Sequence, residues 1–285
     1  MAEEVIGGYR LVNLMMTGQS SQVWEVVELS SHRHFAMKLL LPEKVRDMEQ
    51  RRMLLHEAKV GKQLAHPNVI KIVQVSTEAA NPYFVMEFFP AGSLKLRIVR
   101  KQHEFIKEKA HDILKQAATA FAYMNSSGWV HRDVKPDNIL VNAAGDVRII
   151  DFALAQRIQK PSFFSRFFKK KGLTQGTRSY MSPEQIRGEP LDGRADLYSF
   201  GISMYEIVTG RPPFRAGSNQ ELLLKHITEK PPSPQAYNKD LTDEFCELVL
   251  HTLAKKRDER PRDFHQVLMK LKTIRIFKSA EAKAE

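Results

Sequence analysis

The stretch that decides the fold reads HRDVKPDN, residues 131–138. Within it, Asp133 and Asn138 place two oxygen-bearing side chains on one expected loop, and Lys135 lies between them. Two short apolar runs follow, and Asp151 supplies a third oxygen donor at the end of the hairpin that they predict. Holding a divalent ion against a polyphosphate requires such oxygen atoms, while a carboxylate orients the attacking hydroxyl. This stretch therefore predicts phosphoryl-transfer chemistry.

Together with Asp151, the stretch resembles the catalytic loop and the metal-binding loop of protein kinases. The resemblance implies that Asp133 orients the substrate hydroxyl and that Lys135 neutralises the transferred phosphate. It also implies that Asn138 and Asp151 hold Mg²⁺, with Mn²⁺ as an alternative metal. A lysine two residues after the aspartate is similar to the serine/threonine branch of the family, which implies a serine or threonine acceptor in a protein substrate.

Motifs upstream resemble the nucleotide-binding half of the same family. Lys38, at the end of FAMK (residues 35–38), is similar to the lysine that anchors the α- and β-phosphates of ATP. Glu57, which precedes HPNV at residues 66–69, is implied to be the partner that holds Lys38 in place. The resemblance assigns further positions to nucleotide binding, namely Gly18, Val23, Ala36 and Leu140.

The run YFVMEF, residues 83–88, is similar to the last strand of the small lobe and its continuation into the hinge. The resemblance implies that Met86 is the gatekeeper. It also implies that the backbone of Glu87 and Phe88 hydrogen-bonds the edge of adenine. Residues 90–92, Pro-Ala-Gly, mark the hinge, so the ATP cleft is expected there, between two lobes.

Motifs downstream resemble the end of an activation segment and the helices that support it. Thr177 and the run SPE at residues 182–184 match that end, and Thr177 is implied to tie the segment to the substrate site. Asp196 is similar to the aspartate that supports the catalytic loop, and Arg260 to the arginine that pairs with Glu184. Each motif alone is weak evidence, but their order along the chain makes the resemblance specific.

The runs at residues 180–185 and 209–214 are most similar to bacterial members of the eukaryotic-type serine/threonine kinase family. The resemblance implies an α+β, bilobal protein kinase fold. Its small lobe is mainly antiparallel β with one long helix, and its larger lobe is mainly helical. The expected divisions are an N-terminal lobe that clamps the nucleotide (1–89), a C-terminal lobe with the catalytic loop, activation segment and substrate site (90–275), and a C-terminal tail (276–285).

Apolar spacing agrees with this division. Short alternating runs from Tyr9 to Met86 predict strands, interrupted by one long helix near residues 43–65 with Pro42 in its first turn. From Gly92 onward, helical spacing dominates. Helices are predicted at residues 104–127, 183–188, 195–210, 219–229, 241–254 and 263–277.

Composition limits the class of protein. At 285 residues, with 42% hydrophobic and 27% charged residues, the chain can bury a large core, more consistent with two lobes than with one.

The sequence contains no apolar run of membrane-spanning length and no basic-then-apolar start, so a cytoplasmic location is expected. Its single cysteine, Cys246, excludes an internal disulfide and lies in a helical apolar pattern that predicts packing. The net charge of +11 permits nucleic-acid binding, but no nucleic-acid motif accompanies it, and no feature assigns an oligomeric state.

Two departures from the family pattern bear on activity. In the phosphate-binding loop only Gly18 of three expected glycines is present, because Met16 and Ser21 occupy the other two places. Glycines there permit positive φ and close approach of backbone amides to phosphate, so we expect weaker or slower nucleotide handling. Ala153 replaces the glycine that usually follows Asp151-Phe152, which restricts backbone rotation. Because the five polar catalytic positions are all present, an active kinase is favoured, with a pseudokinase scaffold as the alternative.

The expected activation segment is strongly basic. Between Asp151 and Glu184 there is no acidic residue, but there are seven basic ones: Arg157, Lys160, Arg166, Lys169, Lys170, Lys171 and Arg178. Arg132 resembles the arginine that captures a phosphate on this segment. Phosphate on Ser162, Ser165 or Thr174 would offset the local repulsion, and we favour Thr174 because it lies three residues before Thr177.

An aromatic insert, FFSRFFKKK at residues 163–171, lies within that segment. Its four phenylalanines fall on one face of a helix, and three lysines follow them. Three interpretations stay open. The first is a short structural or inhibitory helix, the second is a docking surface for an acidic partner or substrate, and the third is an anchor for an anionic membrane surface.

Overall fold

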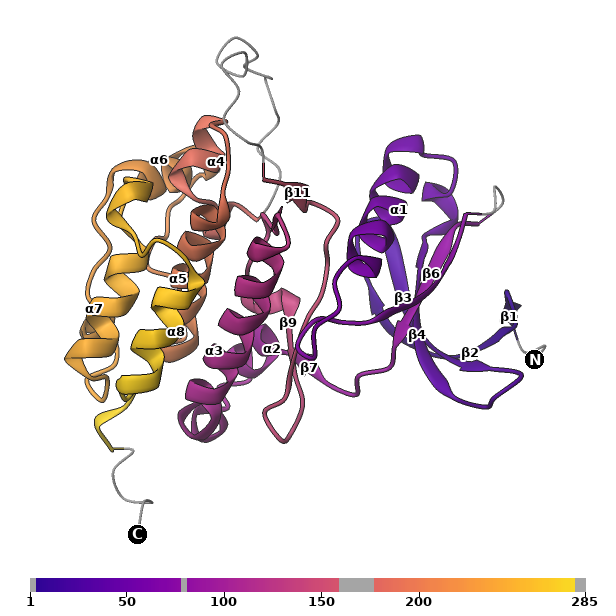
Figure 1. Ribbon diagram of the computed structural model, residues 1–285, viewed down its shortest axis with the longest axis horizontal. Coiled ribbons are helices and arrows are strands. Elements are labelled where there is room, and N and C mark those ends of the chain that lie inside the picture. The colour runs from indigo at the N-terminus through magenta and orange to yellow at the C-terminus, as the bar shows by residue number, and fades with distance from the viewer. Residues whose placement is uncertain (1–3, 78–80, 159–176, 280–285) are drawn as a thin grey trace. The chain divides into compact units, whose positions relative to one another are not determined.

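The structure is a computed structural model that describes residues 4–77, 81–158 and 177–279. It divides into two compact units. The first comprises the chain up to Pro90 together with Ile150–Ala153, and the second comprises Ala91–Ile149 and the chain from Leu154. The first is built on a sheet and the second mainly on helices (Figure 1), as the predicted α+β fold requires.

The first unit contains a six-stranded antiparallel sheet in the order β1-β2-β3-β4-β6-β5. The strands are β1 (Val5–Ile6), β2 (Tyr9–Thr17), β3 (Ser21–Glu28), β4 (His34–Leu40), β5 (Ile72–Ser76) and β6 (Tyr83–Glu87). Alternate side chains of the central strands form a buried apolar cluster that includes Val26, Met37 and Val85. The intervening positions of β4, Ala36 and Lys38, point to the opposite face, as the period of two requires.

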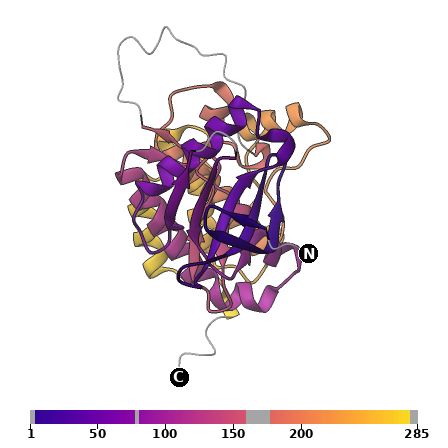
Figure 2. The same cartoon turned by 90° about the vertical axis from the view of Figure 1, so that its right-hand side faces the viewer.

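One long helix, α1 (Met48–Lys62), packs on the sheet through β4, β5 and β6 (Figure 2). The predicted start near residue 43 was wrong, because Pro42 opens a separate 3₁₀ turn, Pro42–Lys44. The α-helix begins after Asp47, whose carboxylate accepts hydrogen bonds from the backbone N–H groups of Glu49 and Gln50. Gly61 permits close packing, since a Cβ there would lie 2.6 Å from Cγ1 of Ile72.

The second unit begins with two small sheets. A three-stranded sheet has the order β10-β9-β7, formed by β7 (Gly92–Ser93), β9 (Ile139–Val141) and β10 (Val147–Ile149). A two-stranded sheet pairs β8 (Trp129–Val130) with β11 (Gln156–Arg157). The catalytic-loop stretch leaves β8 and ends in a 3₁₀ turn, Pro136–Asn138, that leads directly into β9. The predicted hairpin is therefore β9–β10, and Asp151 follows it.

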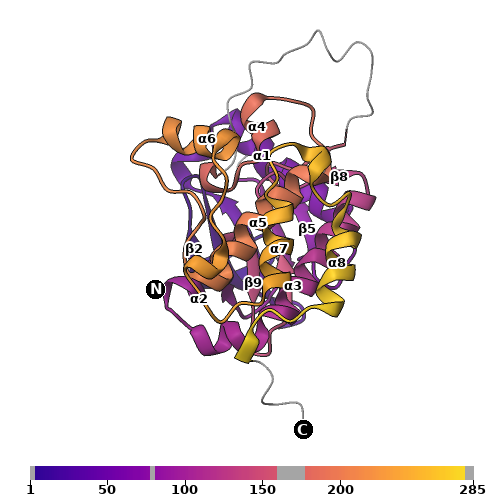
Figure 3. The ribbon, with the colours of Figure 1, turned by 90° about the vertical axis from the view of Figure 1, so that its left-hand side faces the viewer.

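Helices form the rest of the second unit (Figure 3). They are α2 (Leu94–Val99), α3 (His103–Ser126), α4 (Pro183–Arg187), α5 (Gly193–Thr209), α6 (Asn219–Thr228), α7 (Asp243–Thr252) and α8 (Phe264–Thr273). The six predicted helices are confirmed, with starts within two residues of those expected. The predicted end at residue 277 was wrong: α8 stops at Thr273, because Ile276 and Phe277 are buried and Phe277 bridges to Leu241.

Helix α5 is the central element of the second unit. Fourteen of its seventeen residues are buried, and it contacts both α3 and α7. Asp192 caps its start by accepting from the N–H of Arg194, and Gly210 ends it in the left-handed conformation. Cys246 is buried in α7, so its predicted packing role is confirmed. Among the described helices, none combines the length and the apolar character that crossing a bilayer requires.

Candidate functional site

The backbone of the catalytic loop is held from below by Asp196 of α5. Its carboxylate accepts hydrogen bonds from the N–H groups of His131 (2.8 Å) and Arg132 (2.9 Å), and from the side-chain amide of Asn125 (3.0 Å). Burial raises the pKa of Asp196, while these donors act against the rise. Arg132 has a positive φ of 69°, which is rare for a side-chain-bearing residue. The expected support of the loop by Asp196 is thus present.

Four polar side chains contact one another at this loop, namely those of Asp133, Lys135, Asn138 and Thr177. The Nζ of Lys135 donates to Oδ2 of Asp133 and to Oγ1 of Thr177, each at 2.6 Å. The backbone N–H of Thr177 donates to Oδ1 of Asp133 at 3.0 Å. The side-chain nitrogen of Asn138 donates to the carbonyl oxygen (2.8 Å) and to Oδ2 (3.2 Å) of Asp133. Because the nitrogen of Asn138 is used in this way, its amide oxygen is the atom that would face a cation.

Lys38 of β4 and Glu57 of α1 form a buried ion pair in the first unit. The Nζ of Lys38 lies 2.9 Å and 2.7 Å from the two carboxylate oxygens of Glu57. Burial raises the pKa of Glu57 to about 7, against the opposing charge of Lys38, and the negative Asp151 adds to the rise. Burial acts to lower the pKa of Lys38, but the charges of Glu57 and Asp151 outweigh it and leave that pKa raised.

Sheet register explains how the other nucleotide-binding candidates of the first unit share one face. Val23 on β3 pairs across the sheet with Lys38, and Ala36 pairs with Met86 on β6. Because Ala36 and Lys38 are two residues apart on one strand, all four lie on the same face. The N–H of Glu87 donates to the carbonyl of Lys71 at 2.9 Å, so this backbone donor is already hydrogen-bonded within the first unit. Phe88 follows directly, and Leu140 lies on β9 in the second unit.

The phosphate-binding loop, which joins β2 to β3, contains no residue with the positive φ that favours glycine. The N–H of Gly18 donates to the carbonyl of Ser21 at 2.8 Å. Met16, Gly18 and Ser21 all have negative φ, and a Cβ at Gly18 would meet only the oxygen of Ser21, at 3.4 Å. Met16 is 54% exposed on the edge of the turn. In this conformation the two missing glycines cause no backbone strain.

The segment after β10 has its unusual backbone at Asp151 rather than at Ala153. Asp151 has a φ of 67°, whereas Ala153 has an ordinary φ and its N–H donates to Oδ1 of Asp151 at 3.4 Å. Alanine therefore fits this conformation of the loop without strain.

The end of the activation segment is fixed by a buried ion pair. Both guanidinium NH groups of Arg260 donate to the carboxylate of Glu184, at 2.7 and 2.8 Å, as expected from the sequence. Arg132 donates to the carbonyl of Leu154 at 3.4 Å, and burial lowers its pKa. The candidates Ser162, Ser165 and Thr174, and the insert 163–171, lie outside the described residues.

Some supporting residues have no signal in the sequence. Asn125 of α3 donates to Asp196 and to the carbonyl of Trp129, and Gln185 of α4 donates to the carbonyl of Arg132 at 2.9 Å. Asn125 and Asp196 are 71 residues apart in the sequence, and Gln185 and Arg132 are 53 apart, so local patterns cannot reveal these two contacts.

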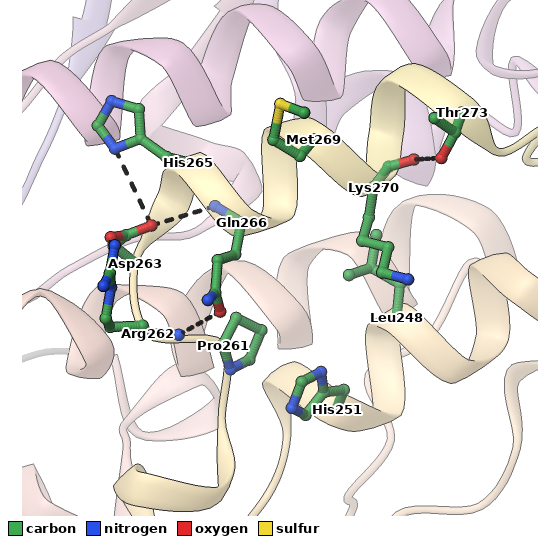
Figure 4. A pocket seen from close by; sticks show the side chains of 10 residues that line it. All are labelled: Leu248, His251, Pro261, Arg262, Asp263, His265, Gln266, Met269, Lys270 and Thr273. Carbon is green, nitrogen blue, oxygen red and sulfur yellow. Dashed lines mark hydrogen bonds and ion pairs between the residues drawn. The ribbon is translucent and has the colours of Figure 1, made fainter.

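An open pocket of about 670 Å³ lies between α7 and α8 (Figure 4). Its polar groups bind one another: Asp263 accepts from the N–H of Gln266, and the side chain of Gln266 accepts from the N–H of Arg262. The pocket contains none of the residues that the sequence assigns to the site.

Residues 9–271 match the family described as the protein kinase domain, and the chain belongs to that family. It is similar to a probable serine/threonine-protein kinase of Clostridium acetobutylicum (29% identity over 94% of this chain and 40% of the relative). It is also similar to serine/threonine-protein kinase PknB of Mycolicibacterium smegmatis (33% identity) and of Mycobacterium tuberculosis (32%), each over 88% of this chain and 40% of the relative. The chain thus spans about two-fifths of the length of these curated relatives. Members of this family generally use ATP and Mg²⁺.

Proposed function

We propose that this chain transfers the γ-phosphate of ATP to serine or threonine hydroxyls of proteins. The observation that carries the proposal is the contact set of Asp133, in which one carboxylate is oriented by Lys135, Asn138 and the backbone of Thr177. Phosphoryl transfer depends on positioning and on charge stabilisation, and this arrangement supplies both. The names of the relatives, which are serine/threonine kinases, support the choice of acceptor.

Asp133 orients the acceptor hydroxyl and takes its proton as the oxygen bonds to the γ-phosphorus and the bond to the β-phosphate oxygen breaks. Lys135 offsets the negative charge on the transferred group, and Lys38, fixed by Glu57, holds the α- and β-phosphates. Mg²⁺, or Mn²⁺ in its place, supplies charge neutralisation at the phosphates when it is bound.

The amide oxygen of Asn138 and the carboxylate of Asp151 are hard oxygen donors of the kind that Mg²⁺ prefers. Within the part of the chain that the structure describes, no three His, Cys, Asp or Glu side chains gather into a metal site. A metal held here would therefore take most of its ligands from phosphate and water, as Mg²⁺ commonly does at nucleotide sites.

The test is transfer of labelled phosphate to the chain itself and to a generic protein acceptor, with and without EDTA, followed by phosphoamino-acid analysis. We expect metal-dependent label on serine or threonine and none on tyrosine. Label no higher than in the EDTA control, from protein that still binds Mg-nucleotide, would favour the second candidate, a nucleotide-binding pseudokinase scaffold. The observation that favours that candidate is the loss of two of three loop glycines, at Met16 and Ser21.

The pair of Glu57 and Lys38 predicts a pH dependence. With a pKa of about 7, raised from the ordinary 4.5, Glu57 is mostly protonated at pH 6 and mostly ionised at pH 8. Only the ionised form pairs fully with Lys38, so kcat/KM for ATP at saturating Mg²⁺ should rise about tenfold between these pH values. Glu57→Gln, which does not titrate, should be less active and lack this inflection. An unchanged inflection in that variant would assign it to another group.

Regulation by phosphorylation of the activation segment is part of the proposal. The support is the charge of the segment: between Asp151 and Glu184 there are seven basic residues and no acidic one. Phosphate on Thr174 would reduce this positive charge. Arg132 is the proposed phosphate-binding residue. Mass spectrometry of protein incubated with Mg-ATP should find phosphate on Thr174, and protein that carries none anywhere in residues 152–182 would contradict this.

The remaining assignments concern lobes, location and partners. We retain residues 1–89 as the nucleotide clamp, 90–275 as the catalytic and substrate lobe and 276–285 as a tail, in a cytoplasmic protein. The insert 163–171 retains its three interpretations: a structural helix, an acidic partner or substrate, or an anionic membrane. Co-sedimentation with anionic vesicles that does not change when all four phenylalanines are replaced would exclude the membrane.

A further inference from the structure

Arg97 of α2 reaches the turn of the β9–β10 hairpin. One guanidinium nitrogen, Nη2, donates to the carbonyl oxygens of Val141 (3.0 Å) and Asn142 (2.9 Å), where β9 ends. The other, Nη1, donates to the side chain of Gln102 at 2.9 Å. The guanidinium carbon of Arg97 lies over the ring of Phe105, 3.8 Å from the ring centre. The guanidinium is therefore fixed on several sides at once.

This hairpin connects the two residues proposed to hold the metal. Asn138 directly precedes β9, and Asp151 follows two residues after β10 ends. Leu140, the candidate nucleotide contact of the second unit, lies within β9 itself. Because a paired hairpin of three-residue strands moves largely as one piece, displacement at its turn also displaces its open end.

The two strands of the hairpin are held at the turn by different helices. Gln116 of α3 secures the β10 side, since its side chain donates to the carbonyl of Gly145 (2.9 Å) and accepts from the N–H of Val147 (3.1 Å). Arg97 secures the β9 side. Hydrogen bonds from a charged donor are stronger than neutral ones, and Arg97 is half-buried. Its loss would take this donor from the carbonyl of Val141, a buried residue, and from the carbonyl of Asn142, which would keep the N–H of Gly145 as a donor at 3.3 Å.

We infer that Arg97 is a positioning residue for the nucleotide and metal sites, acting on Asn138 and Leu140 through the β9–β10 hairpin. This inference rests on the proposed function for the identity of the ligands. It predicts that Arg97 affects the binding of Mg-nucleotide more than the rate of transfer once the site is saturated.

The test compares Arg97→Ala with the matched control Arg100→Ala, an exposed arginine three residues on at the end of the same helix. For Arg97→Ala we expect KM for ATP and the Mg²⁺ concentration for half-activation each to rise at least fivefold, with kcat within threefold of wild type. Arg100→Ala should stay within 1.5-fold in all three. Values for Arg97→Ala that match the control, or a loss confined to kcat and thermal stability, would overturn the inference.

Two conservative variants keep the test informative if Arg97→Ala folds poorly. Arg97→Lys keeps the charge but replaces the two donor nitrogens with one, and Phe105→Leu keeps the hydrogen bonds but removes the aromatic face. Both should give intermediate KM values, and wild-type values in both would overturn the inference. Titration with a fluorescent ADP analogue and Mg²⁺ measures binding without transfer. If wild type binds but does not transfer, while Arg97→Ala binds at least fivefold more weakly, the proposed function fails and the inference stands.

Discussion

Replacement of Asp133 with asparagine should lower kcat for phosphoryl transfer by about 10²- to 10⁴-fold, the usual contribution of a positioned general base. Asparagine has nearly the same shape, but it cannot take the proton of the acceptor hydroxyl. It also disturbs the contacts of the carboxylate. An amide nitrogen would face either the donors Lys135 and Asn138 or the N–H of Thr177, so one donor-to-donor contact is unavoidable.

The measurement is steady-state kinetics with a coupled ADP assay. Nucleotide affinity should change little, because Asp133 contacts catalytic-loop residues and Thr177 rather than the predicted phosphate-binding pair of Lys38 and Glu57. Asp137→Asn is the matched control, since Asp137 is an exposed carboxylate four residues along the same loop, and it should retain activity within about threefold. Asp133→Asn protein with more than a tenth of wild-type kcat would contradict the assigned role.

Much of the site could be predicted because its residues lie in short contiguous motifs. The run at residues 131–138 carries Asp133, Lys135 and Asn138 within six positions, so one loop brings them together. The face shared by Val23, Lys38 and Met86 also follows from strand alternation once the strands are paired.

The sequence-based predictions were wrong or incomplete where two local signals competed, or where the deciding contact joins residues far apart in the sequence. Pro42 is a proper helix-start residue, but it opens a 3₁₀ turn, and the cap that starts α1 is Asp47. Helix α2 has six residues, too few to show a helical period, so neither it nor Arg97 was predicted. The hydrogen bonds of Arg97 to Val141 and Asn142 span more than forty residues of sequence, and no local pattern encodes them.

The second large effect concerns stability and is expected for Arg260→Met. The guanidinium is fully buried, forms a two-point pair with Glu184, and also donates to the carbonyls of Arg194 (2.7 Å) and Ala254 (2.8 Å). Methionine fills a similar volume but leaves the carboxylate of Glu184 buried without a counter-charge. Breaking a buried pair in this way costs about 3–5 kcal/mol. At roughly 2–4 °C per kcal/mol, the melting temperature should fall by on the order of 10 °C.

Thermal and urea unfolding followed by circular dichroism would measure the loss. Arg262→Met is the control, because Arg262 is 81% exposed, and its side chain is paired only with the adjacent Asp263 in the described residues; it should change stability by less than about 0.5 kcal/mol. If Arg260→Met is no less stable than this control, the buried pair is not a major stabilising contact.

A double-mutant cycle separates the pair from the other contacts of Arg260. Glu184→Gln removes the charge of the carboxylate but keeps a hydrogen-bonding side chain, so the buried guanidinium loses its counter-charge in that variant. In the double variant Glu184→Gln with Arg260→Met neither charge is left, and the uncompensated-charge cost of both single variants disappears. The double variant should therefore be more stable than the sum of the two single losses predicts, by about 1–3 kcal/mol. Strict additivity would mean that the cost of Arg260→Met comes from the lost bonds to the carbonyls of Arg194, Ala254 and Lys255, and that the ion pair itself contributes little.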